Sequence, residues 1–258
     1  MPSNKPFSTA SLCTGLSFFI PFSSNLFKNF SGSSISSFTS IYLLILIKHK
    51  NSLMERKKGK FIVIEGIDGA GGETQTKLIK NFLEEKGKNV LVLRYPDRKN
   101  PIGKVIYQFL ETNLELTPTT LFLLYFADFI KDINLIKKSL NSGMFIIADR
   151  YFTSTLAYQS VQGIKISTML KMAQIFKLPK PDITILLKIS PETSLKRKYK
   201  EKKKLDRFEK DKEFLNKVAK SYEKLARKNV FCKWKIVNAE KSKQDVFEEI
   251  RKIIEKWV

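Results

Sequence analysis

The stretch FIVIEGIDGAGGETQTKL, residues 61–78, constrains the fold of this 258-residue chain more than any other segment. An apolar run leads into closely spaced glycines and then into a pattern with helical spacing. A strand that ends in such a turn and continues as a helix directs backbone N–H groups and a helix N-terminus toward one point, where an anion can bind. The segment predicts a strand, a phosphate-binding loop and a helix that opens at about Gly72. A glycine turn without a ligand is the alternative that this loop alone leaves open.

Two residues of this loop depart from the pattern G-x-x-x-x-G-K-[ST]. Gly66 and Gly71 match the two glycines, whereas Gly72 stands in place of the lysine and Glu73 in place of the hydroxyl residue. The backbone cradle needs neither side chain. The loop nevertheless loses a cation for the outer phosphates and a hydroxyl ligand for Mg²⁺, and it gains a negative charge.

From residue 60 onward, strand and helix patterns alternate, which is typical of a parallel sheet with crossover helices. The expected strands cover residues 61–64, 89–95, 144–149, 182–189 and 234–237. The expected helices cover residues 74–86, 102–111, 118 to about 140, 151–161, 166–177, a segment after Pro191, an apolar stripe from Phe214 to Leu225, and 246–257. No repeat and no second domain are expected within residues 55–258.

Residues 1–54 contain no Asp or Glu and are rich in Ser and Phe. We expect a leader outside the domain, either disordered or upstream sequence translated in error, with Met54 as the natural start. A targeting peptide is the alternative. The most apolar part, residues 41–47, is far shorter than the roughly 20 residues that span a bilayer, so no membrane partner is expected.

The formal charge of +22 raises the question of nucleic-acid binding. The lysines are spread over nearly every expected helix and accompany no nucleic-acid-binding module, so no nucleic-acid partner is expected. The two cysteines, Cys13 and Cys232, form no disulfide framework, which favours a reducing, cytoplasmic location.

Three further segments carry chemistry. Arg98 ends YPDR after the second expected strand, and Arg150 lies in ADRY after the third; the third segment is a basic run, residues 196–207, that continues into DRFE. The first two follow carboxyl ends of strands, the edge at which open α/β sheets bind ligands. Two arginines beside a phosphate cradle can clamp an anion through paired hydrogen bonds.

Together these segments resemble the thymidylate kinase family. The resemblance covers residues 60–258, and FIVIEGIDGAG, ADRYFTSTLAYQ, PDITILLKISPE and DRFE are its specific parts. It implies a single P-loop domain with a five-stranded parallel sheet flanked by helices. It also implies a homodimer that transfers the γ-phosphoryl group of ATP, with Mg²⁺, to dTMP, giving dTDP.

The resemblance assigns a role to each matching position. The ATP phosphates would be held by Gly66, Ile67, Asp68, Gly69, Ala70, Gly71, Gly72 and Glu73. Catalytic roles fall on Asp68, Arg150 and Arg207, the last in a lid that closes over ATP, and metal ligation on Asp68 and Glu73. Binding of dTMP falls on Arg98, Tyr125, Arg150, Thr155, Tyr158 and Gln159.

Other departures leave alternatives open. Phe129 stands where the family has an arginine on the thymine side, and Lys188 replaces a frequent acidic residue. The lid lysines Lys202, Lys203 and Lys204 could replace the missing loop lysine, whereas Lys77 lies five helical positions away and points elsewhere. The alternatives to an active dTMP kinase are a nucleotide-binding protein without catalysis and a kinase for another nucleoside monophosphate.

Overall fold

The computed structural model describes residues 58–200 and 205–258. Within them, five parallel strands form one sheet in the order β2-β3-β1-β4-β5. The strands are β1 (Phe61–Glu65), β2 (Val90–Arg94), β3 (Phe145–Asp149), β4 (Ile183–Lys188) and β5 (Trp234–Asn238). This confirms the expected five-stranded parallel sheet. The leader, residues 1–54, lies outside the described residues, and its assignment stays a prediction.

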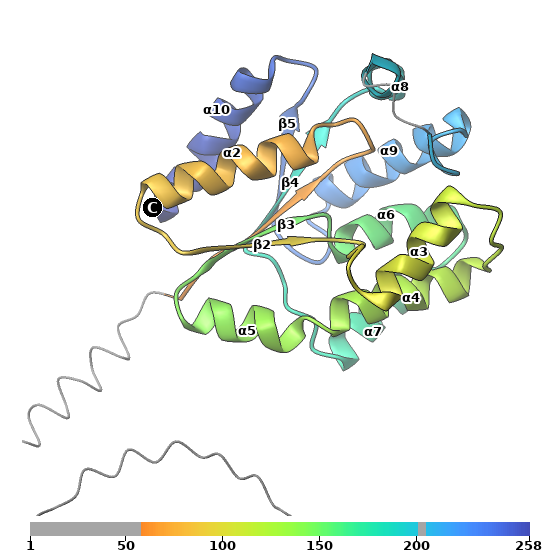
Figure 1. The fold of residues 1–258 in the computed structure, drawn as a ribbon, viewed down its shortest axis with the longest axis horizontal. Coiled ribbons are helices and arrows are strands. Elements are labelled where there is room, and N and C mark those ends of the chain that lie inside the picture. The colour runs from red at the N-terminus through yellow and green to blue at the C-terminus, as the bar shows by residue number, and fades with distance from the viewer. Residues whose placement is uncertain (1–57, 201–204) are drawn as a thin grey trace, which may run out of the picture. The chain divides into compact units, whose positions relative to one another are not determined.

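Helices cover both faces of the sheet (Figure 1). On one face lie α2 (Gly72–Glu85) and α10 (Lys243–Ile254). On the other face α5 (Ile133–Asn141) and α9 (Lys212–Arg227) contact the strands, and α6 (Phe152–Val161) packs beside α9. The remaining helices are α3 (Pro101–Glu111), α4 (Pro118–Ile130), α7 (Ile166–Ile175), α8 (Pro191–Lys200) and the 3₁₀ turn η1 (Glu255–Trp257).

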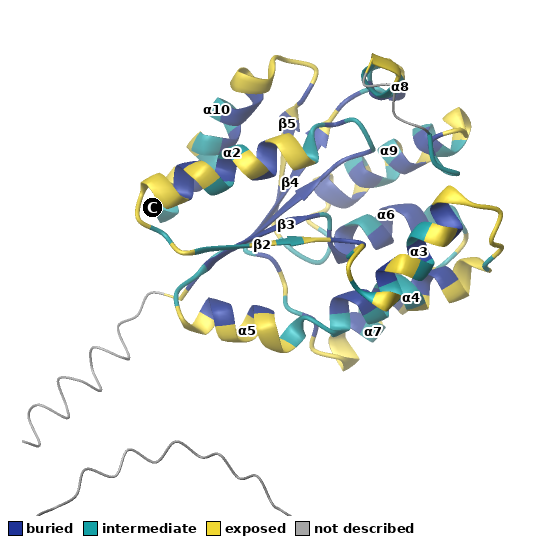
Figure 2. Ribbon diagram, viewed as in Figure 1, coloured by how far each residue is buried: buried dark blue, intermediate teal, exposed yellow. Residues whose placement is uncertain are grey.

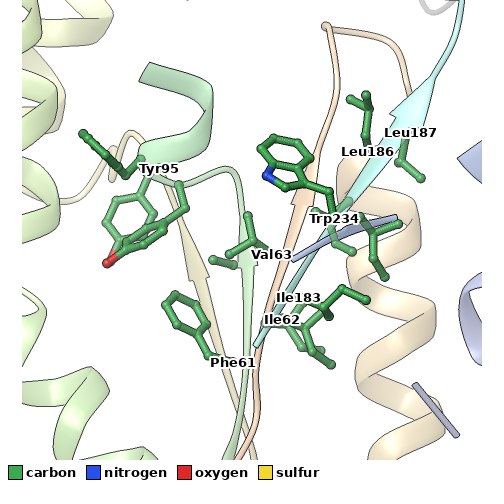
Figure 3. Packing of buried hydrophobic residues seen from close by; sticks show 14 of the residues in the cluster. Phe61, Ile62, Val63, Tyr95, Ile183, Leu186, Leu187 and Trp234 are labelled. Atoms are coloured by element: carbon green, nitrogen blue, oxygen red, sulfur yellow. The ribbon is translucent and has the colours of Figure 1, made fainter. Parts of the chain in front are cut away.

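The central strands are buried because helices cover both of their faces. Every residue of β1 and β3 is buried, which fits their continuous apolar runs. The edge strands β2 and β5 keep exposed positions, and the helices turn their buried sides toward the sheet (Figure 2). Phe61, Val63 and Trp234 belong to the main hydrophobic cluster (Figure 3). None of the helices in the described residues has the length and apolar character that a membrane span requires.

The helix expected from Pro118 to about Leu140 is in fact two helices, α4 and α5, which was not predicted. The Asp132 N–H bonds to the carbonyl of Phe129, three residues back, at 3.2 Å. The Asp132 carboxylate accepts the Tyr95 hydroxyl at 2.8 Å. This tie to the residue after β2 redirects the chain, and a pattern local to residues 118–140 does not contain it. The last helix begins earlier than expected, because Ser242 caps it by accepting the Asp245 N–H.

Candidate active site

A cavity of about 390 Å³ opens at the carboxyl ends of β1, β2 and β3. Its walls come from the glycine loop (residues 66–73), the start of α2, the segment after β2, helices α3, α4, α6 and α8, and the segment that follows residue 204. This is the edge at which ligands bind in open parallel sheets. The expected position of the site is therefore matched by a real cavity.

The glycine loop is held open toward the cavity by its backbone and by α8. Gly71 precedes α2 with a φ of 96°, a left-handed conformation that glycine adopts without strain. At Gly69, whose φ is 79°, an added Cβ would lie 2.9 Å from the Ser194 carbonyl oxygen. The Ser194 hydroxyl donates to the Asp68 carbonyl, and Arg197 donates to the Gly69 carbonyl at 3.2 Å. These hydrogen bonds tie the two loop carbonyls to α8. The first N–H groups of α2 remain available for an anion.

The two altered loop positions lie against acidic and basic neighbours. A Cβ on Gly72 would lie 2.7 Å from Oδ1 of Asp149, the last residue of β3. Glu73 accepts from Lys77 at 2.9 Å and from Arg94 at 3.0 Å. The hydrogen bond from Lys77 and the charge of Arg94 lower the pKa of Glu73. Both carboxylate oxygens of Glu73 are therefore bound by cations, which weakens its fit as a metal ligand.

Asp68 and Arg150 meet at the centre of the cavity. Their side chains form an ion pair at 3.0 Å, and the Tyr158 hydroxyl donates to Asp68 at 3.3 Å. Burial disfavours the ionised Asp68, but the charges of Arg150 and Lys198 outweigh it and hold the pKa of that carboxyl below its ordinary value. Asp68 is therefore a carboxylate that offers charge, and it is a poor proton donor.

Glu65, to which no role was assigned from the sequence, supports the Asp68–Arg150 pair through hydrogen bonds to the residues that follow Arg150. Its carboxylate accepts the Tyr151 N–H at 3.1 Å, the Thr153 hydroxyl at 2.6 Å and the Tyr222 hydroxyl at 2.8 Å. Burial raises the pKa of Glu65, and the charge of Arg150 opposes that rise. Glu65 thus fixes the backbone that carries Arg150. Its signal in the sequence is an acidic residue that ends an apolar strand.

The predicted acceptor residues from α4 and α6 come together on one wall of the cavity. Tyr125, Thr155, Tyr158 and Gln159 all line it, together with Phe129. Gln159 is fully buried, and both polar atoms of its amide lack a hydrogen-bond partner among the described residues. The buried Thr155 hydroxyl likewise has no partner in that part of the chain. Phe129 packs edge-to-face on Tyr95 at 5.0 Å between ring centroids.

Two predicted site residues do not line the cavity. Arg98 pairs with Glu111, and its guanidinium lies 3.4 Å from the centre of the Tyr107 ring. Arg207 donates to the carbonyl of Leu114 at 3.0 Å and pairs with Glu115 at 3.0 Å, so it braces the connection between α3 and α4. Their roles toward dTMP and ATP therefore stay predictions. Lys202, Lys203 and Lys204 lie outside the described residues.

Lys198, Arg94 and Asp149 line the cavity without having been assigned by the sequence analysis. Lys198, from α8, pairs with Glu209 at 2.5 Å. Arg94, the last residue of β2, pairs with Glu73 at 3.0 Å and lies 3.4 Å from Asp149. Position at the carboxyl end of a strand was the available signal for Arg94 and Asp149. Lys198 was one basic residue among many.

Asp206 and Glu209 place two further carboxylates beside Asp68. One ligand atom from each of Asp68, Asp206 and Glu209 lies within 4.8 Å of the others. Burial, with repulsion from Asp68 and Glu209, raises the pKa of Asp206 to about 7. The cluster concentrates negative charge beside the glycine loop, which contributes Asp68, and Arg150 and Lys198 balance part of this charge.

A phosphate cradle of this form, placed at the edge of a five-stranded parallel sheet, defines a P-loop kinase of the nucleoside-monophosphate type. A family model described as thymidylate kinase matches residues 64–250. The chain belongs to the thymidylate kinase family.

Individual relatives agree with this assignment. The chain is 36% identical over 199 residues to a probable thymidylate kinase of Pyrococcus horikoshii, covering 75% of this chain and 94% of that protein. It is 42% identical over 173 residues to the thymidylate kinase of Buchnera aphidicola, covering 64% and 81% respectively. The solved structure of thymidylate kinase from Candida albicans is similar with a TM-score of 0.64 and 28% identity, over 77% of this chain and 92% of that one.

Proposed function

We propose that this chain transfers the γ-phosphoryl group of ATP to dTMP, giving dTDP. Membership of the thymidylate kinase family supports the reaction. The observation that carries the acceptor assignment is the pair of unpartnered polar groups on the cavity wall, the Gln159 amide and the Thr155 hydroxyl. An unsatisfied buried polar group costs about 1–3 kcal/mol. A base edge that supplies the missing hydrogen bonds would recover this free energy.

The rest of the acceptor wall matches a pyrimidine ring. Tyr125 offers aromatic surface, and stacking a base on an aromatic side chain contributes about 1–3 kcal/mol. Tyr158 belongs to the same wall and bonds to Asp68, so its ring would pack against the sugar of the nucleotide. Phe129 carries no hydrogen-bonding group, so recognition of the base would depend on Thr155 and Gln159.

The phosphates would lie between the glycine loop and Arg150. Backbone N–H groups of residues 66–73 would hold those of ATP, and Arg150, already ordered by Asp68, would contact the phosphate being transferred. Phosphoryl transfer needs mainly positioning and charge neutralisation, which these fixed groups supply. Closure over the bound nucleotide, which the family resemblance assigns to the basic run, would exclude water.

Mg²⁺ fits the oxygen donors that face the cavity. Asp68, Asp149 and Asp206 present carboxylates there, and Mg²⁺ is bound by one or two such groups together with phosphate oxygens and water. When bound, the ion would supply positive charge beside the phosphates. Glu73 is the weaker of the two ligands expected from the sequence, because Lys77 and Arg94 occupy its oxygens.

A nucleotide-binding protein without transfer activity is the second candidate, favoured by the absence of a side-chain cation at Gly72. Transfer to another nucleoside monophosphate is the third, favoured by Phe129. We also propose a cytoplasmic homodimer, supported by the family resemblance and by the scarcity of cysteine.

A coupled assay with the full chain, ATP, Mg²⁺ and a panel of nucleoside monophosphates tests the proposal. We expect turnover with dTMP and a raised KM for dTMP in Gln159→Ala. The control is Gln174→Ala, in α7 and away from the cavity lining. Binding of ATP without turnover on any acceptor would favour the second candidate, and a preference for another monophosphate would favour the third.

A further inference from the structure

The glycine loop has no side-chain cation of its own, because Gly72 carries no side chain. Backbone N–H groups and the α2 dipole then face the outer phosphates of a nucleotide alone. A phosphate chain carries several negative charges, so another cation within reach of the loop would strengthen binding. This inference rests on the proposed function, since it concerns the ATP phosphates of the same site.

Four cations of the described residues line the cavity, and two of them pair with largely covered carboxylates. Arg150 is paired with Asp68, and Lys198 is paired with Glu209. The Arg150 and Lys198 side chains are 22% and 18% exposed in these pairs. Within the described part of the chain, neither forms a hydrogen bond or ion pair with residues 72–74 at the start of α2. The remaining two, Arg94 and Lys77, lie at the loop.

Arg94 is the better placed of these two. Its guanidinium lies 3.4 Å from the Asp149 carboxylate, and the other oxygen of that carboxylate is the atom that a Cβ on Gly72 would approach at 2.7 Å. Arg94 therefore contacts the same carboxylate, that of Asp149, that the side chain of a lysine at position 72 would pass. Among residues 58–200 and 205–258, Lys77 bonds to Glu73 alone. It is also the more exposed cation, with 72% of its side chain accessible against 58% for Arg94.

Glu73 holds Arg94 at this place. The Glu73–Arg94 pair spans α2 and β2, which are separated by 21 positions in the sequence, at 3.0 Å. The pair is about half exposed, so it is weak and can exchange for a stronger partner. A phosphate is such a partner, since guanidinium–phosphate hydrogen bonds form in parallel pairs.

We propose that Arg94 replaces the missing loop lysine as the cation that binds the outer phosphates of ATP, and that Glu73 is its positioning residue. Glu73, which stands in place of the usual hydroxyl residue, would then compensate for the lysine that is missing at Gly72. It provides the anchor for an arginine that comes from the neighbouring strand and not from the loop.

ATP binding by the full chain in the presence of Mg²⁺, measured by calorimetry, tests this proposal without depending on turnover. Arg94→Met should weaken ATP binding by roughly tenfold to a hundredfold, the loss that accompanies a hydrogen bond to a charged group. Arg227→Met is the matched control, because Arg227 makes a similar exposed pair with Glu223 at 3.2 Å and lies outside the cavity lining. It should bind ATP as the parent does.

A double variant separates phosphate contact from simple neutralisation of Glu73. In Arg94→Met/Glu73→Gln both charges are absent. If Arg94 served only to neutralise Glu73, this double variant would bind ATP as tightly as the parent does. We expect ATP binding to stay weak in that variant and to recover in Arg94→Met/Gly72→Lys, where the loop regains a cation. Thermal melts of each variant show whether the fold is retained.

The outcomes separate this inference from the proposed function. Parent-like ATP affinity in Arg94→Met, or in Arg94→Met/Glu73→Gln, overturns the role of Arg94 even if the parent phosphorylates dTMP. Weakened ATP binding in both, with no turnover by the parent on any acceptor, supports the role of Arg94 and overturns the proposed activity. A parent that does not bind ATP overturns both.

Discussion

The Asp68 carboxylate lies 3.0 Å from the Arg150 guanidinium, and the backbone at Arg150 has a φ of 70°. A non-glycine residue in this left-handed region carries strain of roughly 1–2 kcal/mol. This conformation is held by the ion pair and by hydrogen bonds from Arg150 to Ser154 and Tyr222. The hydrogen bond from the Tyr151 N–H to Glu65 fixes the backbone on the other side of Arg150. The side chain is thereby ordered before a phosphate arrives.

The first prediction concerns this pair. Asp68→Asn and Arg150→Met should each destabilise the fold, and a double-mutant cycle should give a coupling free energy of about 1–3 kcal/mol, because both side chains are largely covered. Urea denaturation of the four proteins measures the coupling. Additive effects would show that the two side chains do not stabilise each other.

The second prediction concerns pH. Asp206 has a pKa of about 7 in the folded chain against an ordinary value of 3.8, so the folded state binds its proton more tightly than the unfolded state does. The stability that this proton contributes is complete below about pH 4 and is lost as the pH rises through 7. Asp206→Asn, which carries no charge, should gain on the order of 2 kcal/mol over the parent between about pH 5 and 8.

Urea midpoints of the parent and Asp206→Asn across this pH range measure the difference. The groups that set the pKa of Asp206 are Asp68, Glu209 and Lys198, all of which stay in place in the variant. A stability difference that does not change with pH would contradict the placement of Asp206 beside Asp68.

The third prediction sets stability against binding. Gln159→Met removes a buried amide that has no partner among the described residues, so the free energy of unfolding without ligand should rise by about 1–2 kcal/mol. The same change should raise the KM for dTMP at least about tenfold. A calorimetric melt and the coupled assay provide the two readouts. A variant that is less stable and binds dTMP normally would show that Gln159 has a structural role.

The fourth prediction concerns the loop itself. Gly72 begins α2 and has no positive φ, and the one close contact of an added Cβ is the end of the Asp149 side chain, which can move. Gly72→Lys should therefore fold. It should raise kcat about tenfold or more in the Arg94→Met background, since a cation at the transferred phosphate stabilises developing charge, and much less in the parent, where Arg94 already supplies that cation. Steady-state kinetics of both proteins test this expectation. An equally large gain in the parent would show that Arg94 does not fill the place of the loop lysine.

The sheet, the glycine loop and most helices could be predicted because their signals are local. Apolar runs, glycine positions and caps lie within a few residues of what they determine. The cavity wall from α6 was expected from the family resemblance, and Thr155, Tyr158 and Gln159 do line the cavity. The break between α4 and α5 was not, because it depends on a bond from Tyr95 to Asp132, 37 positions away.

Side-chain partners chosen across the fold also escaped prediction. Arg98 and Arg207 have the right charge at the right segment, yet Glu111 binds the first and backbone carbonyls near α3 bind the second. Arg94 reads in the sequence as the exposed end of an edge strand. Only its distance to Glu73 and Asp149 shows that it belongs to the loop.

The packing of Phe129 limits which side chains its position can take. Its ring is 1% exposed and packs on Tyr95, and also on Tyr151 at 5.2 Å between ring centroids. An arginine at this position would bring a charge into the aromatic cluster that packs around the phenylalanine, and a buried charge without a partner is strongly destabilising. We therefore expect Phe129→Arg alone to destabilise the fold, so that changes in base recognition must come from other residues of the cavity wall.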